Sequence, residues 1–290
     1  MPKILLLGAT GLLGQALLKE IKLRNLDVVG VARSKADISL DISDDNALIS
    51  LITKNKFTVI INACAITDFK WCESNKGLAY LINARPSAIL TDLAREVNAR
   101  YIFISTDGYY SGDKDFKHKE DEDVLLLNEY VRTKFCGEKF TLTNPESLVL
   151  RTNIVGFRAW PHQPTMVEWV IKSLKENAEM TLFDDYFTSS ISVSQFSKAL
   201  CDLIDKKPSG IINLASSQVS SKAQFIQALA GEFHFGLKST KVGSVSSLSG
   251  PGRAESLGLD ITKAEKILGY HLPNLEEVID QLKKDYDALG

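Results

Sequence analysis

The chain has 290 residues, of which 44% are hydrophobic and 24% are charged, and its formal net charge is −2. This is the composition of a globular protein, with room for one large domain or for a main domain and a smaller lobe. The charge excludes the basic footprint of a nucleic-acid-binding protein, and no apolar run approaches the ~20 residues of a membrane span. Four cysteines and four histidines lie apart without metal-ligand spacing, so we expect reduced thiols, a cytoplasmic location and no metal site.

A phosphate-binding loop is predicted at the N-terminus. Residues 3–7 form a short apolar strand, and leucines recur at helical spacing over residues 12–23. Three glycines, two between the strand and the helix and one in the first turn of the helix, have the spacing G-x-x-G-x-x-G. They interrupt the apolar run, which disfavours a signal peptide. Such glycines let the backbone approach a pyrophosphate, whose oxygens a helix N-terminus can bind. The alternative is a structural turn without a nucleotide. The predicted contacts are Gly8, Thr10, Gly11, Leu12, Leu13 and Gly14.

The end of the second predicted strand, residues 27–32, indicates which dinucleotide binds. An acidic residue there would bond the ribose 2′-hydroxyl of NAD(H), whereas the guanidinium of Arg33 suits the 2′-phosphate of NADP(H). We therefore favour NADP(H), with NAD(H) as the second choice; a solvent-exposed loop arginine is the alternative. Asp41 and Ile42 are expected near the adenine end, although Asp41 could instead cap the following helix.

Strands and helices alternate up to about residue 155, and the strands are apolar on both faces. After the second strand, the predicted elements are a helix at 44–55, a strand at 57–65, a helical pattern at 74–98, a strand at 100–105, a helix at 128–143 and a strand at 147–152. Such alternation predicts an α/β fold with a Rossmann-type, doubly wound parallel sheet.

After residue 155 the pattern changes, which predicts a smaller C-terminal α/β substrate lobe. We expect a dinucleotide-binding domain at residues 1–155, with a returning segment near 185–205, and a mainly substrate-binding lobe at 156–290. A Ser/Gly-rich stretch at 239–253 is predicted to be a loop, which either closes over the substrate or is a plain linker.

Two tyrosine–lysine pairs occur at a spacing of four residues, and only one has a helical context. Tyr110 and Lys114 flank Gly112, which favours a turn. Tyr130 and Lys134 lie in a predicted helix, where residues four apart are neighbours. A tyrosine beside an ammonium can donate or accept a proton in catalysis, because the positive charge lowers the pKa of the phenol.

A third candidate group lies at the end of the strand at 100–105. Ligands of an open parallel sheet bind beyond the carboxyl ends of the strands, where this chain has Ser105, Thr106 and Asp107. The Thr106 hydroxyl could hydrogen-bond a substrate carbonyl oxygen, although a threonine at a strand end is usually a turn residue. We predict Thr106, Tyr130 and Lys134 as the catalytic residues.

These motifs resemble the extended short-chain dehydrogenase/reductases, and most of all the dTDP-4-dehydrorhamnose reductases, which reduce the 4-keto group of a nucleotide-linked 6-deoxysugar. The resemblance covers nearly the whole chain and rests on residues 8–17, 61–67 followed by Glu73, 105–107, the acidic residues 119–123, 128–134, 150–156 and 255–269. The resemblance implies Thr106, Tyr130 and Lys134 as the catalytic residues, and a homodimer is possible. It also implies cofactor contacts at Asn62, Ala63, Cys64, Ala65, Ser105, Tyr130, Lys134 and Thr152, besides the glycine loop.

Substrate-binding positions follow the family pattern less well, since residues 186–192 replace the usual segment of the smaller lobe. The candidates are Thr67, Asp107, Tyr109, Trp160 and Arg253. Arg253 could hold the diphosphate of a nucleotide sugar. Tyr109 and Trp160 could line the pocket or belong to the core.

The resemblance favours an NADPH-dependent reductase of a 4-keto nucleotide sugar over three other functions. A 4,6-dehydratase is disfavoured, because Gly108 replaces the second carboxylate that follows the threonine in dehydratases. A nucleotide-sugar epimerase stays open, since it needs only reversible hydride transfer. A non-catalytic NADP-binding regulatory subunit, like the β subunit of methionine adenosyltransferase, also stays open. For such a subunit the acidic residues 119–123 would be either a partner patch or a solvated loop.

Overall fold

The structure is a computed structural model that describes residues 2–112, 114–160 and 163–289. The chain folds into two compact units. The first unit contains the residues up to Thr106, Leu126–Arg151 and Ser197–Ile212; the second unit contains Asp107–Leu125, Thr152–Phe196 and the residues from Asn213 onward. The boundary near residue 155 between a cofactor domain and a substrate lobe stays a prediction.

Seven strands form the sheet of the first unit, in the order β11-β6-β5-β4-β1-β2-β3. Neighbouring strands from β6 to β3 run parallel, and Leu5 lies opposite Val29 on one side and Ile60 on the other. The strands are β1 Lys3–Leu7, β2 Asp27–Ala32, β3 Ile38–Ser39, β4 Val59–Asn62, β5 Arg100–Ile104, β6 Leu148–Arg151 and β11 Gly210–Asn213. This parallel sheet confirms the predicted Rossmann-type α/β class.

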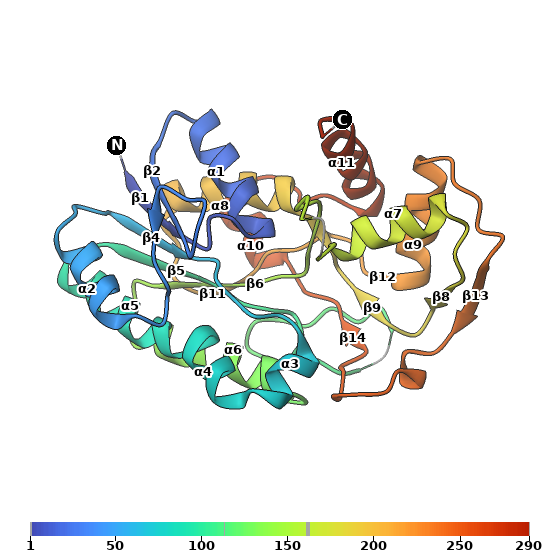
Figure 1. Cartoon of the computed structure of the whole chain (residues 1–290), viewed down its shortest axis with the longest axis horizontal. Helices are drawn as coiled ribbons and strands as arrows, with labels where there is room; N and C mark the ends of the chain where they lie inside the picture. The colour runs from blue at the N-terminus through green and yellow to red at the C-terminus, as the bar shows by residue number, and fades with distance from the viewer. Residues whose placement is uncertain (1, 113, 161–162, 290) are drawn as a thin grey trace. The chain divides into compact units, whose positions relative to one another are not determined.

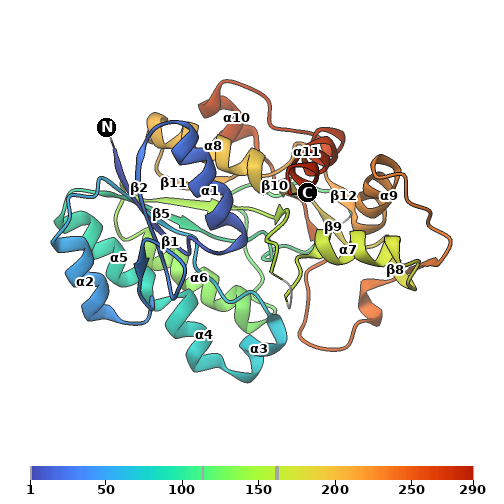
Figure 2. The same ribbon diagram turned by 45° about the horizontal axis from the view of Figure 1, so that its top comes forward.

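Helices cover both faces of this sheet. Figure 1 shows α1 and α8 on one face and α2, α4, α5 and α6 on the other, and Figure 2 shows the same layers from a second direction. The helices are α1 Leu12–Leu23, α2 Asp45–Thr53, α3 Phe69–Ser74, α4 Lys76–Asn83, α5 Arg85–Glu96, α6 Glu129–Thr141 and α8 Val193–Lys206. Under α2 and α5, the side chains of Leu48, Ile52 and Leu90 are fully buried against Leu5 and Ile60. Each such side chain contributes about 1.5–3 kcal/mol of hydrophobic stabilisation.

The segment predicted as one helical pattern at 74–98 is divided in the structure. Helix α3 ends at Ser74, α4 ends at Asn83, and α5 begins at Arg85 with Pro86 in its first turn. Proline has no N–H to donate, so it suits the first turn of a helix and would break a continuous one. The expectation of one continuous helical segment at 74–98 is therefore wrong.

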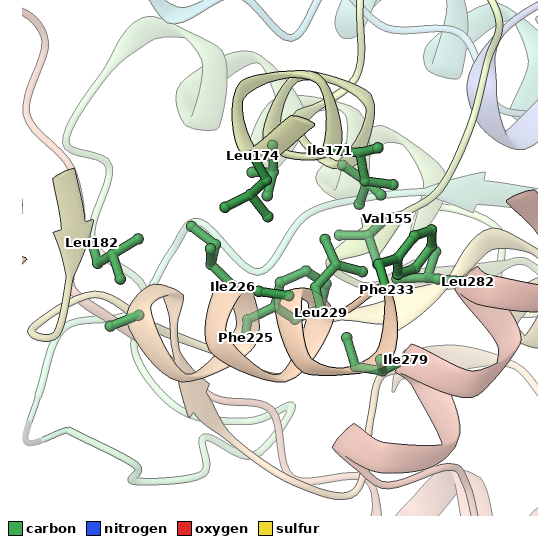
Figure 3. Packing of buried hydrophobic residues seen from close by; sticks show 14 of the residues in the cluster. Val155, Ile171, Leu174, Leu182, Phe225, Ile226, Leu229, Phe233, Ile279 and Leu282 are labelled. Atoms are coloured by element: carbon green, nitrogen blue, oxygen red, sulfur yellow. The ribbon is translucent and has the colours of Figure 1, made fainter. Parts of the chain in front are cut away.

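The second unit has short strands and a separate core. Its strands are β7 Ile154–Val155, β8 Met180–Phe183, β9 Phe187–Thr188, β10 Ile191–Ser192, β12 Ser220–Ser221, β13 Thr240–Gly243 and β14 Ser256–Leu257. Its helices are α7 Met166–Lys175, α9 Lys222–Glu232, α10 Thr262–Leu268 and α11 Leu275–Asp287, with a 3-10 turn at Val245–Ser247. Figure 3 shows Ile171 and Leu174 of α7 facing Phe225 and Leu229 of α9 in this core.

The Ser/Gly-rich stretch at 239–253 is only partly a loop, which corrects the prediction. Its first residues form β13, which pairs in parallel with β8 through Thr240 and Met180. Asp185 then accepts a hydrogen bond of 2.8 Å from the Val245 backbone and fixes the 3-10 turn.

None of the helices within the described ranges combines the length and the apolar character that crossing a membrane requires.

Candidate functional site

The glycine loop joins β1 to α1 through close backbone contacts. Gly8 has a φ of +86°, and a Cβ there would lie 3.0 Å from the Ala63 carbonyl. A Cβ on Gly14 would lie 2.0 Å from the Gly8 carbonyl oxygen, which is shorter than any van der Waals contact. Gly11 is the N-cap of α1 and makes no side-chain cap. The first turn of α1 therefore has backbone N–H groups that no side chain caps, and anion binding there stays a prediction.

The other predicted loop contacts can act only through their backbones or from the edge of the loop. The Thr10 carbonyl accepts a hydrogen bond of 2.9 Å from Gln15 Nε2. Leu13 points into the core, and Leu12 is half-buried. These residues shape the loop around the helix N-terminus.

The turn after β4 lies against the glycine loop and is fixed by Asn62. The buried amide of Asn62 accepts a hydrogen bond of 3.1 Å from the Cys64 backbone and donates one of 3.2 Å to the Tyr101 hydroxyl. This holds Ala63 and Cys64 next to Gly8 and leaves Ala65 exposed. Burial raises the pKa of the Cys64 thiol to about 12, so that this group is neutral at pH 7.

Arg33 follows β2 and Asp41 comes after β3; both are exposed, and they interact electrostatically. Asp41 accepts hydrogen bonds from the backbone and the hydroxyl of Ser43, and these bonds, with a smaller effect of Arg33, lower the pKa of its carboxyl. The cap of α2 is Asp44, which accepts from the Ala47 backbone at 3.0 Å. The alternative that Asp41 caps this helix is therefore wrong. Ile42 is buried in the core below.

Two side chains fix the start of α6, the helix that carries the tyrosine–lysine pair. Asn128 is the N-cap and accepts a hydrogen bond of 3.0 Å from the Val131 backbone. Glu73 accepts one of 2.8 Å from the Glu129 backbone. The first turn of α6 is thereby tied to α3, and Tyr130 lies in that turn.

Tyr130 and Lys134 lie one turn apart on α6, and both are buried. The ring of Tyr130 stacks on Phe69, with 5.3 Å between ring centroids. Lys134 is 2% exposed; its Nζ donates a hydrogen bond of 2.7 Å to the Ile104 carbonyl and lies 4.0 Å from the centroid of Phe103. Burial lowers the pKa of Lys134 to about 7, although the charge of Glu138 opposes this.

The second tyrosine–lysine pair has no helix, as predicted. The ring of Tyr110 is buried, stacks on His118 at 4.4 Å, and its hydroxyl donates to the Lys119 carbonyl. Lys114 has a φ of +47°, outside any helix. The spacing is the same in both copies, but only α6 places the two groups on one face.

At the end of β5, Ser105 and Thr106 are both buried. The Ser105 hydroxyl donates a hydrogen bond of 2.6 Å to Glu138 of α6. Thr106 is the last residue of the first unit before the chain enters the second. Thr67 lies in the same unit and is exposed.

The remaining predicted residues belong to the second unit. Asp107 is buried; its backbone donates to the Thr152 carbonyl at 3.1 Å, and its carboxylate accepts a bond of 2.7 Å from Asn153. Thr152 Oγ1 is buried and has no hydrogen-bond partner among the described residues. Tyr109 is fully buried, which favours the core alternative for this residue. Trp160 is 39% exposed, and the Arg158 guanidinium lies 4.2 Å from its ring.

Arg253 is exposed and acts electrostatically on Tyr186 in the replaced segment. A second cation, Lys222, was not predicted. Its Nζ donates long hydrogen bonds to Thr188 Oγ1 at 3.3 Å and Ser190 Oγ at 3.5 Å. Burial lowers the pKa of Lys222 to about 8, and the charge of Asp107 opposes this.

Three further residues around α6 were missed by sequence reasoning. Asn83 bonds both backbone groups of Ile66 and the Thr133 hydroxyl. Glu138 and Arg151 form a buried ion pair at 2.7 Å. Only Glu138 had a usable signal, because it follows Lys134 by the same four residues that separate Lys134 from Tyr130.

Comparison with known proteins adds a family and a set of relatives. The family described as "RmlD substrate binding domain" matches residues 2–288. The chain is 25% identical over 295 residues to the "Probable low-salt glycan biosynthesis reductase Agl14" of Haloferax volcanii. The matched region covers 97% of this chain and 98% of that protein. It is 36% identical over 186 residues to the "Methionine adenosyltransferase 2 subunit beta" of Xenopus laevis, covering 63% and 52%.

Among solved structures, the chain resembles a dTDP-4-dehydrorhamnose reductase from Bacillus anthracis crystallised in complex with NADP. The TM-score is 0.88 and the identity 21%, over 98% of this chain and 99% of that one. At this identity the likeness shows the shared fold.

Proposed function

The chain belongs to the RmlD substrate binding domain family and is an NAD(P)-dependent oxidoreductase, and on that premise we propose that it uses NADPH to reduce the 4-keto group of a nucleotide-linked 6-deoxysugar. The observation that carries the proposal is the buried pair of Tyr130 and Lys134 on one face of α6, in the same unit as the glycine loop. The reductase from Haloferax volcanii, matched over nearly its whole length, supports the class of reaction.

The first unit fits a dinucleotide cofactor. The backbone contacts of Gly8 and Gly14 leave no room for a side chain at these two positions, and no side chain caps the first turn of α1. The backbone N–H groups of that turn would hold the pyrophosphate. Arg33 would bind the 2′-phosphate that distinguishes NADP(H) from NAD(H). When bound, the reduced nicotinamide supplies a hydride.

Tyr130 would act as the proton donor to the carbonyl oxygen of the substrate. Its hydroxyl titrates near 10 when free, and a neighbouring ammonium makes the phenolate easier to form. Lys134 supplies that positive charge one turn along α6. The Thr106 hydroxyl would donate a hydrogen bond to the same substrate oxygen and stabilise the charge that develops there.

Substrate turnover in one matched pair of variants tests this proposal. NADPH oxidation is followed with a set of 4-keto nucleotide sugars, dTDP-linked sugars first, by loss of absorbance in the nicotinamide band. Tyr130→Phe should lower kcat by about 100-fold or more, because general acid catalysis typically contributes about 10²–10⁴-fold, and should keep NADPH affinity. Tyr110→Phe is the control, since it removes the phenol of the second tyrosine–lysine pair. Wild-type turnover in Tyr130→Phe would refute the role.

A second candidate function is a non-catalytic regulatory subunit, favoured by the 36% identity to the β subunit from Xenopus laevis. The acidic stretch 119–123 gives this alternative less support than its charge suggests. Glu120 accepts a hydrogen bond from the Asn213 backbone, and Glu122 contacts His118 at 2.7 Å, so both serve the second unit itself. Retained NADPH binding without turnover of any nucleotide sugar, together with saturable binding to a methionine adenosyltransferase, would favour this function over the reductase.

A nucleotide-sugar epimerase is distinguished by stoichiometry. An epimerase regenerates its cofactor in each cycle, whereas the proposed reductase consumes one NADPH per sugar. Measuring product and oxidised cofactor in the same reaction separates the two activities.

A further inference from the structure

A buried carboxylate lies one turn beyond Lys134 on α6. Glu138 is 1% exposed, and its two oxygens are bound from two neighbouring strands. Oε1 accepts hydrogen bonds from Ser105 Oγ at 2.6 Å, after β5, and from Arg151 Nε at 3.0 Å, at the end of β6. Oε2 accepts a bond of 2.7 Å from Arg151 Nη2. Hydrogen bonds from the ends of two neighbouring strands therefore fix the position of this carboxylate.

The direct contacts of Lys134 are neutral. Its Nζ meets the Ile104 carbonyl and the face of Phe103, both from β5. The Cys64 thiol, from the turn after β4, also faces it and is neutral because burial raises the pKa of that thiol to about 12. From α6 itself it is faced by Tyr130 and by Glu138. Glu138 is thus the anion that acts on Lys134, with Arg151 as the second cation beyond it.

The packing of α6 on β5 places Lys134 and Glu138 in the same buried environment. A Cβ on Gly137 would lie 2.6 Å from Cζ of Phe103, so α6 rests directly on the ring that also contacts Lys134. Residues at i and i+4 lie on the same face of a helix. Lys134 and Glu138 are therefore both directed at β5, in an environment where water does not screen their charges.

A purely structural ion pair would need only one cation for this carboxylate. Here a second buried basic side chain, Lys134, lies one helical turn from the ion pair of Glu138 and Arg151. An ammonium buried without a nearby anion loses its proton, because desolvation disfavours the charged form. If Lys134 were neutral, Tyr130 would lose the neighbouring positive charge that lowers the pKa of its hydroxyl and makes it a proton donor.

We propose that Glu138 is a positioning residue for the reduction: its carboxylate, held by Arg151 and Ser105, favours the ammonium form of Lys134 next to Tyr130. This inference rests on the proposed reductase function for its catalytic consequence, whereas its physical part concerns the protonation of Lys134 alone.

The test follows the titration of Lys134 directly. The protein is labelled with 13C at the lysine Cε position, and the Lys134 signal is assigned by its loss in Lys134→Met. In Glu138→Gln the midpoint of this signal should fall by about one pH unit or more, the usual effect of a nearby opposite charge. Glu129→Gln is the matched control, because it removes a carboxylate from the same helix whose ion pairs run to the exposed Lys76 and Arg132. An unchanged midpoint in Glu138→Gln would overturn the proposal.

A second variant covers the case in which Glu138→Gln does not fold because Arg151 is left unpaired. Glu138→Gln combined with Arg151→Met removes both members of the ion pair. Its Lys134 midpoint should also fall, since Glu138 rather than Arg151 is the charged group that acts on Lys134. A midpoint equal to that of the wild type in this double variant would overturn the proposal as well.

Kinetics separates this inference from the proposed function. The alkaline limb of the kcat profile of the reductase should move to lower pH in parallel with the Lys134 midpoint. If the midpoint falls while the protein turns over none of the nucleotide sugars, the reductase function fails and the electrostatic role stands. If the protein turns over a nucleotide sugar while the Lys134 midpoint and the kcat profile stay unshifted in Glu138→Gln, the reductase function stands and the electrostatic role of Glu138 fails.

Discussion

Removing the buried ammonium of Lys134 should change how the stability of the protein depends on pH. Burial lowers the pKa of Lys134 from 10.5 to about 7 in the folded protein. Between these values the unfolded chain binds a proton that the folded chain has lost, so the free energy of unfolding of the wild type rises with pH. Below pH 7 both states are protonated and the cost of the buried charge is fully present. Lys134→Met lacks the amine, so its free energy of unfolding does not contain this contribution to the pH dependence.

The size of the effect follows from the shift. A pKa difference of 3.5 units, from 10.5 to about 7, corresponds to about 5 kcal/mol. The side chain is 2% exposed, so solvent does not screen this interaction appreciably. Within the range accessible to measurement, pH 7 to pH 10, the wild type should gain about 4 kcal/mol relative to Lys134→Met, or about 1.4 kcal/mol per pH unit.

Urea denaturation at each pH measures this difference. The free energies of unfolding of the wild type and Lys134→Met are determined between pH 6.5 and 10 and subtracted, which removes the titration of all other groups. The control is Lys139→Met, because Lys139 lies on the same helix and is exposed; its difference from the wild type should not vary with pH. A difference for Lys134→Met that stays constant over this range would show that Lys134 has the same pKa in the folded and the unfolded chain, and the conclusion that burial lowers its pKa would be refuted.

Two further predictions concern the cofactor. Gly14→Ala would place a Cβ 2.0 Å from the Gly8 carbonyl, and should lower stability by about 1–3 kcal/mol and abolish detectable NADPH binding, measured by thermal melting and by fluorescence titration. Gly77→Ala is its control, since a Cβ there meets nothing within 4 Å; equal melting temperatures for the two variants would contradict the packing argument. Arg33→Asp should shift the ratio of NADPH to NADH affinity toward NADH by about tenfold or more, since the guanidinium would lose a charge-assisted bond to the 2′-phosphate. Equal ratios in the variant and the wild type would exclude Arg33 from the 2′ site.

Features encoded in short stretches of sequence could be predicted. The glycine spacing after a strand and the apolar alternation of strands and helices depend on neighbours a few residues away, and the parallel sheet confirms them. The choice between the two tyrosine–lysine pairs was also local, because helical periodicity places Tyr130 and Lys134 on one face of α6, whereas Gly112 marks a turn near Tyr110. The prediction of one helical segment at 74–98 failed because its periodicity conceals helix ends at Ser74 and Asn83 and a new start at Arg85.

What the sequence by itself determined is therefore the fold class, the glycine loop between β1 and α1, and the residue types on α6. Only the tertiary structure decided the electrostatic state of those residues. The pairing of Glu138 with Arg151 brings a helix and a neighbouring strand together, and the seating of Lys134 on Phe103 spans 31 residues of chain, 103 to 134. Charge stabilisation depends on how completely water is removed and on which charges remain nearby. Both are properties of the packed molecule, because they are set by side chains that are distant in sequence and adjacent in space.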